Sequence, residues 1–134
     1  MNKEENEKED LERIFPPFVW AIRDFTLDLE MDGKAITPDQ YLENCLEEKT
    51  EKMKEFNECR KCIKKFFPDK KCFVFPQPVK KQDLKSLEIL SDEKLDEEFV
   101  AVSKHFCDYV YERAKPKTVR GALLNGRPLK VNFA

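Results

Sequence analysis

The sequence predicts an α/β fold in which a small parallel sheet is flanked by helices. Two short apolar runs, residues 18–22 and 72–75, carry this prediction, because each has the length and character of a strand buried on both faces. Residues with helical periodicity lie between the two runs and again after the second one. Since two such strands make a poor sheet by themselves, we expect the chain to be a piece of a larger sheet.

Composition narrows the class of protein further. The chain has 134 residues, which is a single-domain length, and 40% hydrophobic residues with 11 Phe exclude a wholly disordered chain. The net charge of −2 does not indicate a nucleic-acid partner, so we expect none. There is no run of 18 apolar residues and no signal-peptide pattern, and the five cysteines are an odd number. We therefore expect reduced thiols and a cytoplasmic protein.

The first predicted strand ends abruptly at Arg23 and Asp24. In open α/β sheets, ligands bind beyond the carboxyl ends of the strands, so these two side chains occupy a position suited to binding. Residues 25–29 alternate in polarity and fit either a short strand or an extended connection. Asp32 and Gly33 then mark a turn.

Three signals for the start of a helix come together after this turn. Thr37 is suited to cap the helix, Pro38 suits its first position, and Gln40 completes a capping box. We expect this helix to run to about Leu46. The charged residues 47–57 break the pattern, and a second amphipathic helix then ends before Pro68.

A turn at residues 69–71 leads into the second predicted strand, and a Pro- and Lys-rich loop at residues 76–82 follows it. A long helix comes after residues 91–94 and ends before Pro116. Its apolar residues recur at steps of three or four: Leu95, Phe99, Val102, Phe106, Tyr109 and Val110. Asn125 and Gly126 predict a hairpin turn between residues 122–124 and 129–131.

Structural or solvent-exposed roles fit the other reactive side chains better than catalytic or binding roles do. Cys59 and Cys62 form a CxxC inside a helical pattern, where thiols act as small apolar groups rather than as half of a zinc site. His105 and Cys107 are conceivable as a nucleophile pair, although a histidine on a helix is more often a surface or core residue. A cluster of lysines interleaved with phenylalanines fits a solvated helix face as well as a surface for nucleic acid or anionic lipid: Lys64, Lys65, Lys70 and Lys71.

The end of the first strand offers a specific chemistry. The carboxylate of Asp24 can accept two parallel hydrogen bonds from the N1–H and the exocyclic N2 amino group of guanine, which adenine lacks on that edge. A buried carboxylate left without these donors costs roughly 1–3 kcal/mol or more, so one aspartate selects the base. Arg23 is suited to lie over the base or to pair with a phosphate. An ordinary ion pair at a strand end remains the alternative.

Several blocks of sequence, in order, resemble guanylate-binding proteins, which are interferon-inducible, dynamin-related large GTPases. The likeness covers residues 15 to about 129 and is strongest over residues 62–75. Further blocks lie at residues 18–29, 36–42, 95–99, 106–107, 115–118 and 125–126. The resemblance implies that this chain is the C-terminal half of the family's GTPase domain: a partial parallel sheet of a P-loop GTPase without the phosphate-binding half. Residues 1–14 are then a polar loop or disordered segment, residues 15–131 the half-domain, and residues 132–134 a tail.

The resemblance also implies the site residues. Asp24 matches the guanine-reading aspartate of the family, and Arg23 matches the arginine beside it. The loop after the second strand matches the guanine cap, which closes over the nucleotide and takes part in dimerisation. We call this segment the cap loop, and it consists of Phe75, Pro76, Gln77, Pro78, Val79, Lys80 and Lys81. The implied ligands are GTP and GDP, with Mg²⁺ only in an intact family member.

The sequence has no G-x-x-x-x-G-K-[ST] motif and no Asp-x-x-Gly motif. Phosphate and metal contacts provide most of the positioning for hydrolysis, so we expect no catalytic or metal-binding residue here. The isolated chain is expected neither to hydrolyse GTP nor to bind it tightly. Two functions follow: guanine-nucleotide binding as the base-recognition half of a GTPase of innate immunity, or a catalytically silent module that pairs with full-length relatives through its cap face.

Overall fold

The computed structural model describes residues 15–119 and 122–123. These residues form two compact units. The first unit consists of residues 15–18, 48–69, 114–119 and 122–123, and the second consists of residues 19–47 and 70–113. The second unit contains the strand ends at which the sequence predicts a ligand.

A two-stranded parallel sheet forms the centre of the second unit. Strand β1 (Phe18–Ile22) lies beside β4 (Lys70–Val74). Phe18 N–H donates to the carbonyl of Asp69 at 2.9 Å, and Phe75 N–H donates to the carbonyl of Ile22 at 2.8 Å. Because residue numbers rise together along both strands, the pair is parallel, which confirms the predicted α/β class.

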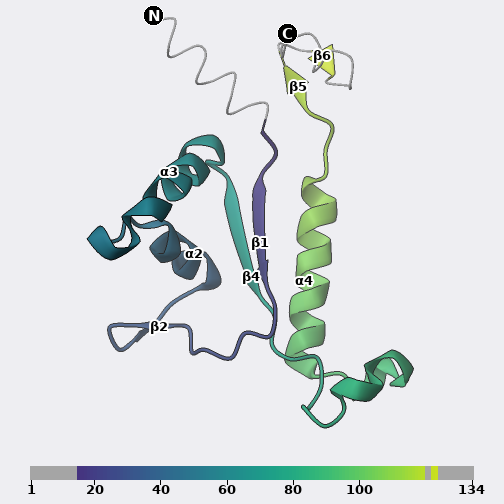
Figure 1. Cartoon of the computed structure of the whole chain (residues 1–134). Helices are drawn as coiled ribbons and strands as arrows, with labels where there is room; N and C mark the ends of the chain where they lie inside the picture. The colour runs from purple at the N-terminus through teal and green to yellow at the C-terminus, as the bar shows by residue number, and fades with distance from the viewer. Residues whose placement is uncertain (1–14, 120–121, 124–134) are drawn as a thin grey trace, which may run out of the picture. The chain divides into compact units, whose positions relative to one another are not determined.

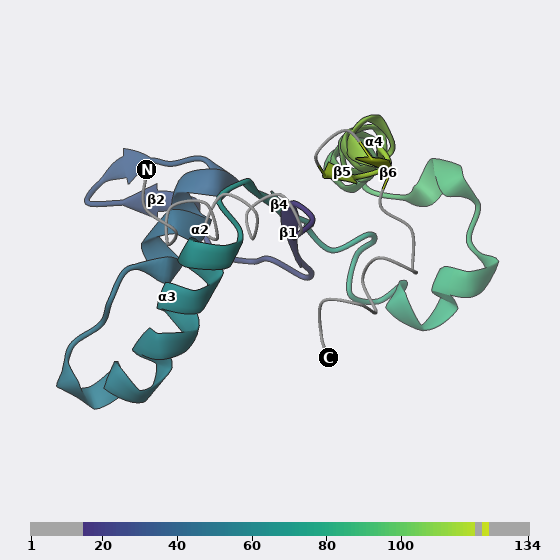
Figure 2. The same ribbon diagram turned by 90° about the horizontal axis from the view of Figure 1, so that it is seen from above.

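Helices α2 (Pro38–Leu46) and α4 (Glu97–Arg113) lie on opposite faces of this pair (Figure 1), and the view from above shows the same arrangement (Figure 2). Trp20 of β1 stacks on Tyr41 of α2, with ring centroids 6.3 Å apart. On the other face, the Phe73 ring meets the rings of three α4 residues edge-on at 5.3–5.5 Å: His105, Phe106 and Tyr109. Buried apolar residues of this unit include Leu42, Leu46, Cys72, Phe73 and Val79.

The start of α2 is determined by local sequence, as predicted. The Thr37 hydroxyl accepts from Gln40 N–H at 3.2 Å, and the Gln40 side-chain oxygen accepts from Thr37 N–H at 2.8 Å. Pro38 occupies the first turn. The capping box therefore satisfies amide groups that a helix start otherwise leaves without partners.

The same turn of α2 covers the outer edge of β4. In a parallel pair, the N–H groups of alternate residues point toward the neighbouring strand. Phe75 N–H points toward β1, so Cys72 N–H, three residues earlier, points away from it. That N–H donates to Oδ1 of Asp39 at 2.8 Å, and Oδ2 of Asp39 pairs with Lys71 Nζ at 2.7 Å. A side chain rather than a strand thus satisfies β4 at this point.

An antiparallel hairpin lies between β1 and α2 in the chain. Strand β2 (Glu30–Met31) pairs with β3 (Lys34–Ala35), with Met31 opposite Lys34. The turn residues Asp32 and Gly33 have φ values of 52° and 74°. Positive φ at both central residues is the geometry of a two-residue hairpin turn, which confirms the predicted turn. Residues 25–29 form the extended connection.

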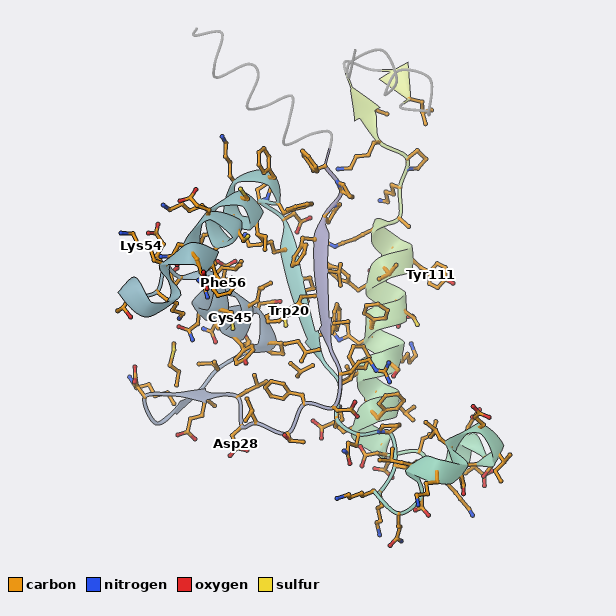
Figure 3. All side chains as sticks on the ribbon, viewed as in Figure 1. Trp20, Asp28, Cys45, Lys54, Phe56 and Tyr111 are labelled. Carbon is orange, nitrogen blue, oxygen red and sulfur yellow. The ribbon has the colours of Figure 1, made fainter. Side chains whose placement is uncertain are left out.

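The 3₁₀ helices η2 (Leu84–Ile89) and η3 (Asp92–Lys94) separate the cap loop from α4. Helix α4 ends at Arg113, before Pro116, in line with the predicted stop. Tyr111 near its end is 81% exposed, and its side chain extends away from the sheet (Figure 3).

The first unit is built around α3 (Asn57–Phe66), which follows the 3₁₀ helix η1 (Glu51–Phe56). Asn57 is only 7% exposed, accepts from Lys49 N–H and donates to Lys49 O, both at 3.0 Å. An aromatic cluster closes the other end of α3, with ring centroids 5.4–5.5 Å apart among Phe15, Phe18, Phe66 and Phe67.

Strands β5 (Thr118–Val119) and β6 (Ala122–Leu123) form a short antiparallel pair. The hairpin predicted at Asn125 and Gly126 lies outside the described residues. Among the helices of the described segments, none combines the length and the apolar character needed to cross a bilayer.

Two details of the strands differ from the prediction. Strand β1 is half-buried, with Ala21 exposed, rather than buried on both faces. Strand β4 begins at Lys70, where the sequence predicts a turn. The charges of Lys70 and Lys71 do not prevent a strand because Glu43 and Asp39 of α2 pair with them.

Candidate functional site

Arg23 and Asp24 follow β1 directly, and hydrogen bonds on both sides hold their position. Phe75 N–H donates to Ile22 O at 2.8 Å, and Phe25 N–H donates to Phe75 O at 3.0 Å. Asp24 has a φ of 52°, in the left-handed region that aspartate tolerates better than most residues. The chain therefore turns sharply at Asp24, while Ile22 and Phe25 remain hydrogen-bonded to Phe75 at the end of β4.

The cap loop is also anchored. Pro78 O accepts from Asp96 N–H at 2.8 Å, and Val79 is buried. Lys80 and Lys81, which follow, are exposed. The loop thus has a fixed base and a positively charged, solvent-facing end.

A cavity of about 620 Å³ lies where these segments meet. This volume is within the range of small-molecule sites, about 300–1,000 Å³. Of the residues predicted for the site, five line the cavity: Arg23, Asp24, Phe75, Pro76 and Pro78. The other predicted cap residues, Gln77, Val79, Lys80 and Lys81, do not line it.

The far wall of the cavity was not predicted. It comes mainly from η2, η3 and α4, and consists of Leu87, Leu90, Asp92, Leu95, Phe99, Ser103, Phe106 and Cys107, with Ala21 of β1 completing the lining. Helical periodicity correctly places Phe99 and Phe106 on one face of α4, whereas Leu95, expected in the same helix, lies before its first residue, Glu97. Periodicity identifies the apolar face of a helix but not what lies opposite that face, so it does not predict a cavity wall.

The exposure of Asp24 corrects one expectation. Strong base selection requires a buried carboxylate, but both Arg23 and Asp24 are exposed in this structure. Water can solvate an exposed carboxylate that lacks a ligand, so the penalty for a wrong base falls to the low end of the range, about 1 kcal/mol. A cavity with mostly apolar walls and one acidic and one basic side chain at the strand end can still orient a flat polar ring.

The other chemical candidates are not assembled into a site. Cys107 lines the 620 Å³ cavity, whereas His105 lines a second cavity of about 480 Å³. Residues two apart on a helix face different directions, so the two side chains do not act as a pair. Cys59 and Cys62 do lie on a helix, α3, but both are exposed rather than packed.

The four lysines predicted as a cluster differ in their surroundings: Lys70 and Lys71 pair with carboxylates, whereas Lys64 and Lys65 are exposed. Lys70 pairs with Glu43 at 3.4 Å and Lys71 with Asp39 at 2.7 Å, which neutralises the half of the cluster on β4. Lys64 and Lys65, in the last turn of α3, are exposed. The interpretation as solvated or paired lysines therefore fits better than a surface for nucleic acid.

The most perturbed thiol lies away from the cavity. Burial raises the pKa of Cys72 to about 11, and the nearby carboxylate of Asp39 acts in the same direction. Such a thiol stays protonated and unreactive at neutral pH. Within the described segments, no three His, Cys, Asp or Glu side chains come together as a metal site, so we assign no magnesium ligand to them.

Comparison with known proteins gives one family. The model of the guanylate-binding protein N-terminal domain matches residues 1–119. Guanylate-binding protein 3 of Homo sapiens is 48% identical over 134 residues, covering 95% of this chain and 22% of the relative. Guanylate-binding protein 1 of Chlorocebus aethiops is 50% identical, with 95% and 23% covered, and guanylate-binding protein 2 of Rattus norvegicus is 48% identical, with 87% and 20% covered. The chain thus spans about a fifth of the length of these relatives.

Proposed function

The chain belongs to the guanylate-binding protein family, and on that premise we propose that it carries the base-reading part of a guanine-nucleotide site. The observation that supports this proposal most strongly is that Arg23, Asp24 and three residues of the cap loop line one cavity. These residues belong to two segments that lie about 50 positions apart in the sequence. A ligand site beyond the carboxyl ends of two neighbouring strands requires that the segments after both strands line the same cavity, as these do.

Each side chain has a distinct role in this proposal. The Asp24 carboxylate accepts hydrogen bonds from N1–H and the N2 amino group of guanine. The Arg23 guanidinium lies against the base plane or pairs with a phosphate. The apolar walls, Phe75 among them, exclude water from the faces of the ring.

The remaining parts of the proposal follow from the family. Residues 15–131 form the second half of the GTPase domain, flanked by residues 1–14 and 132–134. GTP or GDP is the ligand, and Mg²⁺ is bound only in an intact family member. The setting is innate immunity in the cytoplasm, with no nucleic acid as partner.

A titration of the ¹⁵N-labelled chain tests base reading without relying on phosphate contacts. We expect GMP to shift the amide resonances of Asp24 and Phe25 and to bind about fivefold more tightly than AMP, which corresponds to about 1 kcal/mol. IMP lacks the N2 amino group but keeps N1–H, so its affinity lies between the two. Equal affinities for GMP and AMP contradict the proposal.

A second function is favoured by exposed apolar side chains on η2, next to the cap loop. Ile89 is 85% exposed, and Leu87 is also exposed. Exposed apolar side chains that form a contiguous patch can mark an interaction surface. We therefore keep the alternative that the chain pairs, as a homodimer or with a full-length relative, through its cap face, to which η2 adds these apolar side chains, and is catalytically silent.

Co-purification separates the two functions. For the interaction module, a full-length guanylate-binding protein retains the chain with or without GDP, and Ile89→Ser abolishes retention. If the wild-type chain is not retained, or if Ile89→Ser is retained equally, the η2 face is not the interface. The exposed Leu27, which lies outside η2, offers a matched control as Leu27→Ser.

A further inference from the structure

The cap loop is held at its start and at its centre by backbone hydrogen bonds to other elements. At its start, Phe75 is bonded to Ile22 and to Phe25. At its centre, Pro78 O accepts from Asp96 N–H at 2.8 Å. Because Pro78 lines the cavity, whatever fixes Asp96 also fixes that part of the wall.

Asp96 is itself fixed by the start of α4. Its Oδ1 accepts from Glu98 N–H at 3.0 Å and from Phe99 N–H at 3.1 Å, and its carbonyl accepts from Val100 N–H at 3.0 Å. This is the geometry of a helix N-cap, with the side chain satisfying the amides of the second and third helical residues. Asp96 therefore uses its amide for the loop and its carboxylate for the helix.

The residues on either side of Asp96 extend the connection into the cavity. Leu95 lies immediately before it and Phe99 is one of its two side-chain partners, and both line the 620 Å³ cavity. Phe99 also contacts Phe75, with ring centroids 6.2 Å apart. One residue thus organises three parts of the wall although it does not line the cavity itself.

We propose that Asp96 is a positioning residue for the guanine site, holding the cap loop and the first turn of α4 in the arrangement that receives the base. This inference rests on the proposed function, since it concerns the same cavity. Without the carboxylate, the two amides lose their acceptor and the first turn of α4 frays. The cavity is then complete in only a fraction of molecules, and the apparent affinity falls by that fraction.

Matched cap variants test the proposal by GMP titration of the full chain. Loss of an N-cap of this kind is expected to weaken GMP binding about fivefold in Asp96→Ala. Asp96→Asn keeps an oxygen acceptor and restores binding, because asparagine caps helices as well as aspartate. Thr37→Ala removes the N-cap of α2, no residue of which lines the cavity, and leaves GMP binding unchanged.

Two results overturn the inference: wild-type affinity for GMP in Asp96→Ala, or a loss of affinity in Thr37→Ala equal to that in Asp96→Ala.

Hydrogen exchange measured without nucleotide tests the positioning role even if the chain does not bind guanine. The Asp83 amide, which bonds to Lys80 O at 2.8 Å after the cap loop, is expected to exchange faster in Asp96→Ala and not in Thr37→Ala. No preference of the wild-type chain for GMP over AMP contradicts the proposed function, whereas unchanged exchange at Asp83 contradicts the positioning role.

Discussion

Asp39→Ala is the most informative stability change, because Asp39 satisfies the outer edge of β4 with a side chain. The substitution leaves the amide of Cys72, a residue only 2% exposed, without an acceptor. An unsatisfied buried donor costs about 1–3 kcal/mol. The lost pair with Lys71 is partly exposed and adds at most about 1 kcal/mol. We expect a total loss of about 1–4 kcal/mol in the free energy of unfolding.

Two further variants separate these contributions. Asp39→Asn keeps an oxygen for Cys72 N–H and loses only the charge, so we expect a loss of about 1 kcal/mol or less. Glu43→Ala removes an ion pair of the same helix, with Lys70 at 3.4 Å. Its expected effect is about 1 kcal/mol, at the upper end for surface pairs, because the Lys70 side chain is only 10% exposed while the Glu43 carboxylate is half exposed.

Urea unfolding followed by Trp20 fluorescence measures all three variants. Trp20 is the only tryptophan, and it stacks on Tyr41 of α2, so its emission reports contact between α2 and the sheet. Asp39→Ala is expected to cost clearly more than either Asp39→Asn or Glu43→Ala, since it alone removes the acceptor of Cys72 N–H. If Asp39→Asn costs as much as Asp39→Ala, the charge rather than the hydrogen bond supports β4, and the reasoning is wrong.

Three other outcomes follow from the structure. Burial raises the pKa of Cys72 from 9.0 to about 11, so the folded state holds the thiol proton more tightly than the unfolded state does. The free energy of unfolding is therefore expected to fall by about 2–3 kcal/mol as the pH rises from about 9 to about 11. Urea unfolding across this pH range is expected to show a smaller decline in Cys72→Ala. Asn57→Ala removes two hydrogen bonds to Lys49 from a buried position and is expected to cost about 2–4 kcal/mol by the same measurement; a loss below 1 kcal/mol contradicts this. The purified chain, which lacks a phosphate-loop motif, is expected to release no phosphate from GTP above background, and turnover at rates typical of the family contradicts that expectation.

Local sequence predicted the parts of the fold that depend on local interactions. The start of α2 is such a case: Thr37, Pro38 and Gln40 are consecutive or nearly so, and each acts within one helical turn. The turn at Asp32 and Gly33 is another, since its geometry depends on two residues. All the residues that determine a capping box or a two-residue turn are close together in the sequence, so the sequence alone predicts both structures.

Interactions between distant segments were not predicted. The bond from Asp39 to Cys72 joins residues 33 positions apart, and nothing in either neighbourhood indicates it. The start of β4 was placed two residues late for the same reason, because the lysines there are paired by α2. The cavity wall on α4 and the exposure of Asp24 likewise depend on which elements meet, and a single sequence does not carry that information.

The central claim is that the Asp24 carboxylate reads the donor edge of guanine, and a reversal of base preference tests it most directly. Xanthine carries a carbonyl where guanine has the N2 amino group, so an amide at position 24 can donate to that carbonyl and accept from N1–H. We expect the wild-type chain to prefer GMP over XMP, and Asp24→Asn to prefer XMP over GMP, in titrations of the ¹⁵N-labelled chain. A variant that keeps the wild-type preference, or that weakens both ligands equally, contradicts the claim.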